Sequence, residues 1–149
     1  MFTPVSSRAA STYRQASANG ASPHQLVSML FDVLLQAINS ARDGLRQGDV
    51  EAKCRHIGRA VRFLDEGLKA GLDDKQGGEI ASNLRSLYEY CIDRLTVANL
   101  RSDDAILAEV YSLIEPVAQG WRQIGSMGGQ AAAQPAAPAA AKFSPVYAV

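Results

Sequence analysis

The chain has 149 residues, of which 47% are hydrophobic and 20% charged, a balance that indicates one folded domain and excludes a wholly disordered or collagen-like chain. Its 15 basic and 15 acidic residues cancel without forming a basic cluster, so nucleic acid is not expected as a partner. No stretch is apolar over the roughly 20 residues that a bilayer requires, and the beginning lacks the apolar core of a signal peptide. We therefore expect a cytoplasmic protein without membrane insertion.

The uneven placement of charge divides the chain into three parts. Only three charged residues, all basic, lie outside residues 22–124, so that interval is expected to hold the folded domain. Residues 1–21 form a short N-terminal segment that is at best a brief helix needing support from the domain. Residues 125–149 are rich in Ala, Gly and Pro and have no apolar period, which predicts a disordered tail that does not pack on the domain.

Four helical patterns follow one another within the domain. The first opens with Ser22-Pro23-His24-Gln25, in which a serine N-cap precedes proline and is followed after three residues by glutamine. It ends at Gly48, where a left-handed conformation costs little, and Asp49 is expected to cap the second helix. The apolar stripe of that second helix is Val50, Cys54, Ile57, Val61, Leu64, Leu68 and Leu72.

The second half of the domain continues the helical pattern. Residues Asp73–Gly78 have the composition of a loop, and a third helix is expected over about residues 79–100. Ser102 or Asp103 caps the fourth helix, in which Pro116 predicts a kink or a division into two shorter helices. Short connections force neighbouring helices to be antiparallel, so the fold class is an all-α, up-down-up-down four-helix bundle with a short N-terminal segment and a disordered C-terminal tail.

The chain lacks the residue patterns of catalytic, metal and cofactor sites. His24 and His56 are its only histidines, and no Glu-x-x-His pairs are present to hold a metal ion inside a bundle. Gly77-Gly78 could offer backbone amides to an anion, but the acidic residues around them repel one. Cys54 and Cys91 lie in apolar stretches and are expected to be buried and reduced. We expect no enzyme and no cofactor.

The first helix has more apolar residues than one buried stripe requires. Either it is central in the bundle and buried all round, or part of its surface is free for a partner; both explanations stay open. The extra residues are Val27, Met29, Phe31, Leu35 and Ile38. Phe63 and Tyr90 lie off the stripes of their own helices and are expected to be exposed, which favours a groove for a partner helix.

Several segments agree in order and spacing with one known family. They include Ser22-Pro23-His24-Gln25-Leu26, Met29-Leu30-Phe31-Asp32, Gln47-Gly48-Asp49, residues 67–73, Gly77-Gly78-Glu79-Ile80-Ala81, Asn83-Leu84, Leu87-Tyr88-Glu89-Tyr90, Arg94-Leu95, Ala98-Asn99 and Trp121. Together they resemble the flagellin-specific export chaperone family, FliS. The resemblance covers about Tyr13 to Ile124, and Tyr13-Arg14-Gln15 looks like the N-terminal tyrosine element of the family.

The resemblance implies a cytoplasmic chaperone of protein export. Such a protein binds the C-terminal segment of flagellin, prevents its premature polymerisation and delivers it to the export gate of the flagellar type III apparatus, without catalysis, metal or cofactor. The alternative is a regulatory or structural helical adaptor that binds other cytosolic partners. The candidate partner-binding residues are Tyr13, Phe63, Asn83, Leu87, Tyr90, Arg94 and Asn99. The segment around Tyr13 is also predicted to cover part of the groove as a lid.

Overall fold

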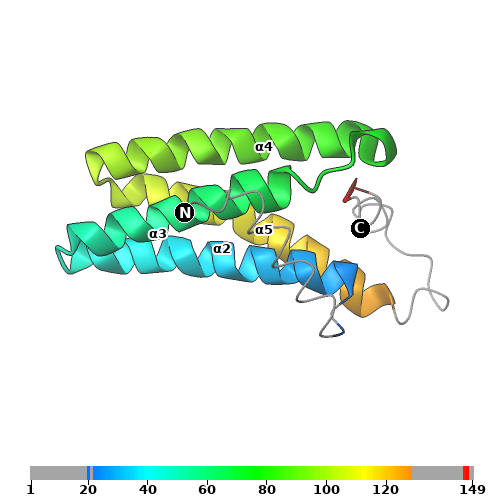
Figure 1. Cartoon of the computed structure of the whole chain (residues 1–149), viewed down its shortest axis with the longest axis horizontal. Coiled ribbons are helices and arrows are strands. Elements are labelled where there is room, and N and C mark those ends of the chain that lie inside the picture. The colour runs from blue at the N-terminus through cyan, green and yellow to red at the C-terminus, as the bar shows by residue number, and fades with distance from the viewer. Residues whose placement is uncertain (1–19, 21, 129–145, 148–149) are drawn as a thin grey trace, which may run out of the picture.

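A computed structural model describes residues 20, 22–128 and 146–147 of the chain. Its elements are α2 (Pro23–Arg46), α3 (Val50–Arg62), the π-helix η1 (Phe63–Lys69), α4 (Asp74–Arg101) and α5 (Asp104–Gly128). Figure 1 shows that η1 continues the line of α3, so the two together form one of the four rods of the molecule. The predicted all-α four-helix bundle is confirmed.

The four rods form a closed ring. Helix α2 packs against α3 and α5, and α4 packs against α5 and against α3 with η1 (Figure 1). Arg42, near the end of α2, pairs with Asp104 at the start of α5, with a distance of 2.8 Å from Nε to Oδ1. His24, at the start of α2, contacts Trp121 near the end of α5. These contacts require α2 and α5 to be antiparallel, as the up-down-up-down prediction states.

The predicted helix boundaries are set by local hydrogen bonds. The Oγ of Ser22 accepts from the backbone N–H of Gln25 at 3.1 Å, and Gln25 Oε1 accepts from the backbone N–H of Ser22 at 2.9 Å. This reciprocal pair is the predicted capping box. Gly48 has φ +71°, and Asp49 Oδ1 accepts a backbone hydrogen bond from the first turn of α3 at 3.0 Å. Both predictions for this turn are therefore confirmed.

The inner face of α3 differs from the predicted stripe. Val50 and Cys54 are exposed, whereas Lys53 is only 4% exposed. The Lys53 ammonium donates hydrogen bonds to the backbone O of Asn99 at 2.9 Å and to the Oγ of Ser102 at 3.0 Å. Because the last carbonyl groups of a helix lack partners within it, the end of α4 favours a cation at this place. The prediction that Cys54 is buried is wrong.

Two further local predictions are corrected. The segment predicted as a loop begins α4, because Asp73 caps a helical turn by accepting from the backbone N–H groups of Lys75 and Gln76, each at 3.1 Å. Gly78, with φ +54° and ψ −127°, then interrupts the helix before it continues to Arg101. Helix α5 runs through Pro116 as one helix, so a division into two shorter helices is wrong.

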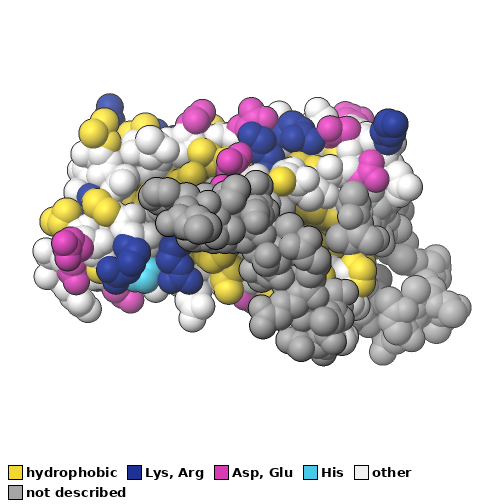
Figure 2. Space-filling view, in the orientation of Figure 1, with side chains coloured by type: hydrophobic (Ala, Val, Ile, Leu, Met, Phe, Trp, Pro, Cys, Tyr) yellow, Lys and Arg dark blue, Asp and Glu magenta, His cyan; other side chains and the backbone are white. Residues whose placement is uncertain are grey.

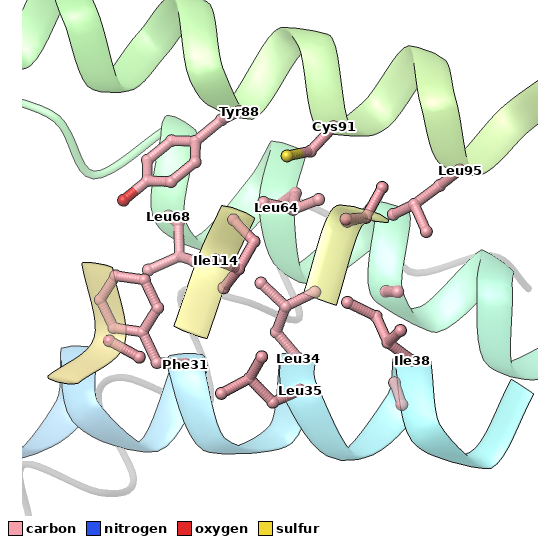
Figure 3. Packing of buried hydrophobic residues seen from close by; sticks show 14 of the residues in the cluster. Phe31, Leu34, Leu35, Ile38, Leu64, Leu68, Tyr88, Cys91, Leu95 and Ile114 are labelled. Atoms are coloured by element: carbon pink, nitrogen blue, oxygen red, sulfur yellow. The ribbon is translucent and has the colours of Figure 1, made fainter. Parts of the chain in front are cut away.

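The core lies between all four rods. In Figure 3 the side chains of Phe31, Leu34 and Ile38 from α2 point toward Leu64 and Leu68 of η1, Tyr88, Cys91 and Leu95 of α4, and Ile114 of α5. Of the extra apolar residues on α2, Met29 is 50% exposed and the other four are buried. Helix α2 is therefore buried over most of its circumference. Cys91 is buried as predicted, and burial raises its pKa to about 12.

Most of the two predicted flanks lies outside the described residues. Of the predicted tail, the structure describes residues 125–128, which form the last turn of α5 and extend the helical part beyond the predicted end at residue 124, and Val146 and Tyr147, which are both buried against the bundle. For these two, the expectation that the tail does not pack on the domain is wrong, because their large apolar side chains gain from leaving water. Among the described residues, none of the helices combines the length and the apolar character needed to cross a membrane.

Candidate partner-binding surface

Four of the candidate residues share one face of α4. Asn83, Leu87, Tyr90 and Arg94 follow one another at intervals of four, three and four residues, which places them on one side of a helix. Asn83 and Tyr90 are exposed, whereas Leu87 and Arg94 are half-buried. The stripe borders the buried face that Tyr88 and Cys91 turn into the core. Tyr90 is exposed as predicted.

This stripe is joined to α5 by a polar network. Glu109 of α5 accepts a hydrogen bond from the Tyr90 hydroxyl at 2.6 Å and another from the Nε of Arg94 at 2.9 Å. These two donors lower the pKa of the Glu109 carboxyl, because both stabilise its ionised form. The same contact raises the pKa of the Tyr90 hydroxyl, which donates to a carboxylate. The network holds the Tyr90 ring at the line where α4 and α5 meet.

Apolar side chains continue the same line. Leu113 and Val117 lie one and two turns after Glu109 on the same side of α5, and Leu87 lies one turn before Tyr90. All three are half-buried and pack against the core. We call Asn83, Leu87, Tyr90, Arg94, Glu109, Leu113 and Val117 the α4–α5 seam. An apolar strip with a charged and hydroxyl-bearing border is the kind of surface on which an amphipathic helix packs.

The remaining described candidates, Phe63 and Asn99, lie away from this seam. Phe63 opens η1 and is half-buried rather than exposed, with the Arg59 guanidinium 5.7 Å from its ring centre. The Phe63 side chain packs against the core from the edge of the buried face, which the spacing of residues within one helix does not reveal. Asn99 lies toward α3, where its backbone O accepts from Lys53 and its Oδ1 is buried without a hydrogen-bond partner. Tyr13 lies outside the described residues.

A second constellation at the end of the bundle was not predicted. The rings of His24 and Trp121 stack with centroids 4.7 Å apart, and each side chain donates to the backbone O of the other residue, at 2.6 and 3.0 Å. A Cβ at Gly125 would overlap the His24 ring, so this glycine leaves the room that the imidazole occupies. The residues are 97 positions apart, and no spacing rule connects them.

The surface of the described residues combines charged and hydrophobic groups. Charged side chains run along α4, and hydrophobic ones appear in patches beside them (Figure 2). The raised pKa of Cys91 keeps its thiol protonated, and burial lowers the pKa of His56. In the part of the chain that the structure describes, no group of three or more His, Cys, Asp or Glu side chains could hold a metal ion.

Comparison with known proteins assigns the chain to a family. Residues 6–128 match the family model described as flagellar protein FliS. The flagellar secretion chaperone FliS of Salmonella typhimurium is 52% identical over 104 residues, which cover 70% of this chain and 77% of that protein. The chain belongs to the FliS family. The resemblance read from the sequence motifs is thereby confirmed.

More distant FliS relatives cover a similar share of the chain. The flagellar secretion chaperone FliSB of Pseudomonas aeruginosa is 37% identical over 107 residues, or 72% of this chain and 84% of that protein. The flagellar secretion chaperone FliS of Bacillus subtilis is 30% identical over 111 residues, or 74% and 81% of the two chains. The family model ends at residue 128, the last residue of α5, so the FliS match includes every helix described above.

Proposed function

We propose that this chain is a cytoplasmic flagellar secretion chaperone. In this proposal it binds the C-terminal segment of flagellin, prevents premature polymerisation and delivers the subunit to the export gate of the flagellar type III apparatus. The observation that carries the proposal is the FliS match over residues 6–128, together with relatives that are named flagellar secretion chaperones. A helical bundle with a half-buried apolar seam supports a role in binding a helical segment.

We infer that the α4–α5 seam receives an amphipathic helix of flagellin. Leu87, Leu113 and Val117 would contact its apolar face, while Tyr90 and Arg94 would meet polar groups at its border. A segment that folds as it binds typically buries on the order of 1,000–3,000 Å², and its ordering costs about 2–5 kcal/mol or more. The net affinity is therefore modest relative to the buried area, which suits a chaperone that must release its client.

Holding a client in this way requires no chemical step. A binder that sequesters the segment needed for polymerisation lowers the concentration of assembly-competent subunits by mass action. Release then follows when the export apparatus or transport itself removes the flagellin segment from the seam. The proposed function thus requires only a surface that binds the flagellin segment and an export apparatus that competes for that segment.

The N-terminal part of the proposal stays a prediction. The segment around Tyr13 is expected to cover part of the binding surface in the free protein and to rearrange when flagellin binds. Hydrogen exchange of residues 8–18 tests this, since partial protection in the free protein should change on addition of a flagellin peptide. Equally fast exchange in both states would contradict the lid.

Binding of a labelled flagellin C-terminal peptide tests the proposed function. The full chain should bind the peptide, and Leu87→Ala and Tyr90→Ala should each weaken binding more than about fivefold, the effect of about 1 kcal/mol. Leu100→Ala is the matched control, because Leu100 is on the same helix but 85% exposed and off the seam stripe. Tyr90→Phe keeps the ring and removes only the hydroxyl bond to Glu109.

The outcomes separate the function from the site. If the wild-type chain does not bind the peptide, the proposed function is wrong. If it binds, and the two seam variants behave like Leu100→Ala, the function stands and the seam is the wrong surface. Tyr90→Phe distinguishes two roles of Tyr90: near-normal binding indicates a ring contact, and a loss as large as that of Tyr90→Ala indicates that the bond to Glu109 positions the surface.

A further inference from the structure

Two residues from the far end of the chain are bound at one end of the bundle. Val146 is 0% and Tyr147 4% exposed. The backbone O of Val146 accepts from the backbone N–H of Asp73 at 2.6 Å, and Tyr147 forms an antiparallel bridge with Leu72. Figure 1 shows this short segment beside the connection between η1 and α4. The pair thus meets the bundle through main-chain contacts, with Val146 in a 3-10 turn and Tyr147 in an isolated antiparallel bridge.

The Tyr147 side chain is recognised from two other helices. Its hydroxyl shares a hydrogen bond of 2.5 Å with the hydroxyl of Tyr88 on α4. Its ring packs edge-on against the indole of Trp121 on α5, with centroids 5.4 Å apart and an angle of 76° between the planes. An edge-to-face arrangement is a favoured geometry for aromatic pairs. The hydroxyl group and the ring of Tyr147 are therefore held by two different helices.

Two glycines make room for the bound pair. A Cβ at Gly71 would lie 3.3 Å from Cδ1 of Tyr147, and a Cβ at Gly77 would lie 3.0 Å from Cα of Val146. A side chain at Gly77 would also meet Ala81 within its own helix at 2.7 Å. At both positions a side chain would press on the Val146–Tyr147 backbone or ring, so the bundle is shaped to accept the pair.

The residues named in these contacts are not members of the α4–α5 seam, although Trp121 lies one turn after the seam residue Val117. Tyr88 is fully buried in the core, whereas the neighbouring seam residues Leu87 and Tyr90 on α4 are half-buried and exposed. Val146 and Tyr147 also lie beyond residue 128, where the match to the FliS model ends. The contact is therefore a feature of this chain in addition to the surface assigned to flagellin.

We propose that Gly71, Leu72, Asp73, Gly77, Tyr88 and Trp121 form a peptide-binding site, the tail site, which Val146–Tyr147 occupies as an exchangeable ligand on the same chain. The ligand chemistry is a short peptide segment in which a β-branched residue is followed by tyrosine. A ligand on the same chain acts at an effective concentration on the order of millimolar, so a site of weak intrinsic affinity is filled until a competing segment is present. The tail thereby keeps an aromatic binding site covered in the free protein.

Trp121 is a built-in probe for this proposal, because it is the only tryptophan of the chain. The full-length Tyr147→Ala variant vacates the ring position, and a synthetic peptide of residues 142–149 is then titrated while Trp121 fluorescence is followed. We expect saturable binding with a Kd below about 0.1 mM, and at least about tenfold weaker apparent binding to the wild-type chain, whose own tail competes at about 1 mM. The same peptide with Tyr147→Ala should produce no saturable change.

The test does not involve flagellin, so its result is independent of the proposed function. Far-UV circular dichroism first establishes that the Tyr147→Ala chain is folded. Full-length Tyr147→Phe keeps the ring, lacks the bond to Tyr88 and should show intermediate apparent binding of the peptide, which provides a second variant with a smaller change to the core. Absence of saturable binding to the Tyr147→Ala chain up to several millimolar, or equal binding to that chain and the wild type, would overturn the proposal. A dimer of the wild-type chain that Tyr147→Ala abolishes would also overturn it, since the tail would then bind a second copy.

Discussion

Lys53 allows the energetic value of one buried polar contact to be predicted. Its side chain is almost fully buried between α3 and the end of α4, and its ammonium donates to the backbone O of Asn99 and the Oγ of Ser102. Lys53→Met keeps an unbranched apolar stem of similar length but removes the charge and both donors. Ser102 is exposed and can turn to water, so the main loss falls on the Asn99 carbonyl group.

A buried acceptor that loses its donor costs about 1–3 kcal/mol. Removal of the ammonium also ends its favourable interaction with the C-terminal dipole of α4, a contribution of about 0.3–1 kcal/mol for an exposed cation. Lys53→Met also removes the cost of burying a charge, which acts in the opposite direction by raising the free energy of unfolding. We therefore expect Lys53→Met to lower the free energy of unfolding by about 1–3 kcal/mol, with a fall in Tm of about 2–4 °C for each kcal/mol.

Urea unfolding measures this change, followed both by far-UV circular dichroism and by Trp121 fluorescence so that a two-state transition can be verified. Lys69→Met is the matched control, because Lys69 Nζ lies 3.5 Å from Asp65 Oδ1 in a more exposed pair. Such a pair contributes about 0–1 kcal/mol. The reasoning is refuted if Lys53→Met is as stable as the wild type, or no less stable than Lys69→Met.

Two further predictions concern stability and thiol chemistry. Gly44→Ala should destabilise the protein by about 1–3 kcal/mol, because the new Cβ would lie 2.9 Å from the backbone N of Lys53. Gly58→Ala should instead stabilise the protein by up to about 1 kcal/mol, because the nearest neighbour of its new Cβ is a flexible side chain at 3.7 Å. Chemical denaturation compares the two, and equal effects would contradict the close approach of α2 and α3. At pH 8 Ellman's reagent should label Cys54 and spare Cys91, whose pKa of about 12 leaves it protonated, until urea unfolds the chain. Labelling of both thiols in the folded protein would be inconsistent with this packing.

Local signals in the sequence determined where α2 begins and ends and where α3 begins. The capping box at Ser22, the left-handed Gly48 and the cap at Asp49 each depend on residues within a few positions of one another, so the sequence contains all the atoms that form them. The four-helix architecture follows from the same signals, because short connections permit only antiparallel neighbours. The family resemblance was likewise available from motif order, and residues 6–128 confirm it.

The candidate surface could be predicted only in part. Tyr90 was identified from its position off the apolar stripe, and the spacing of residues 83, 87, 90 and 94 is visible in the sequence. Their connection to Glu109 on α5 was not, because a hydrogen bond between helices depends on how the two helices are aligned along their axes. Phe63 was misplaced for a related reason, since its packing against the core depends on side chains from other parts of the bundle.

Only the tertiary structure decided which of several neighbouring residues are buried. Lys53 is buried and Cys54 exposed because a backbone carbonyl group at the end of α4 accepts a hydrogen bond from the Lys53 ammonium. The spacing of apolar residues in α3 contains no information about this carbonyl group. Val146 and Tyr147 are buried because Tyr88 of α4 and Trp121 of α5 converge on one place, although both are far from the tail in sequence. The apolar period of a helix predicts roughly which of its faces is buried. Which of two adjacent residues is buried depends on the groups that the other helices present to that face.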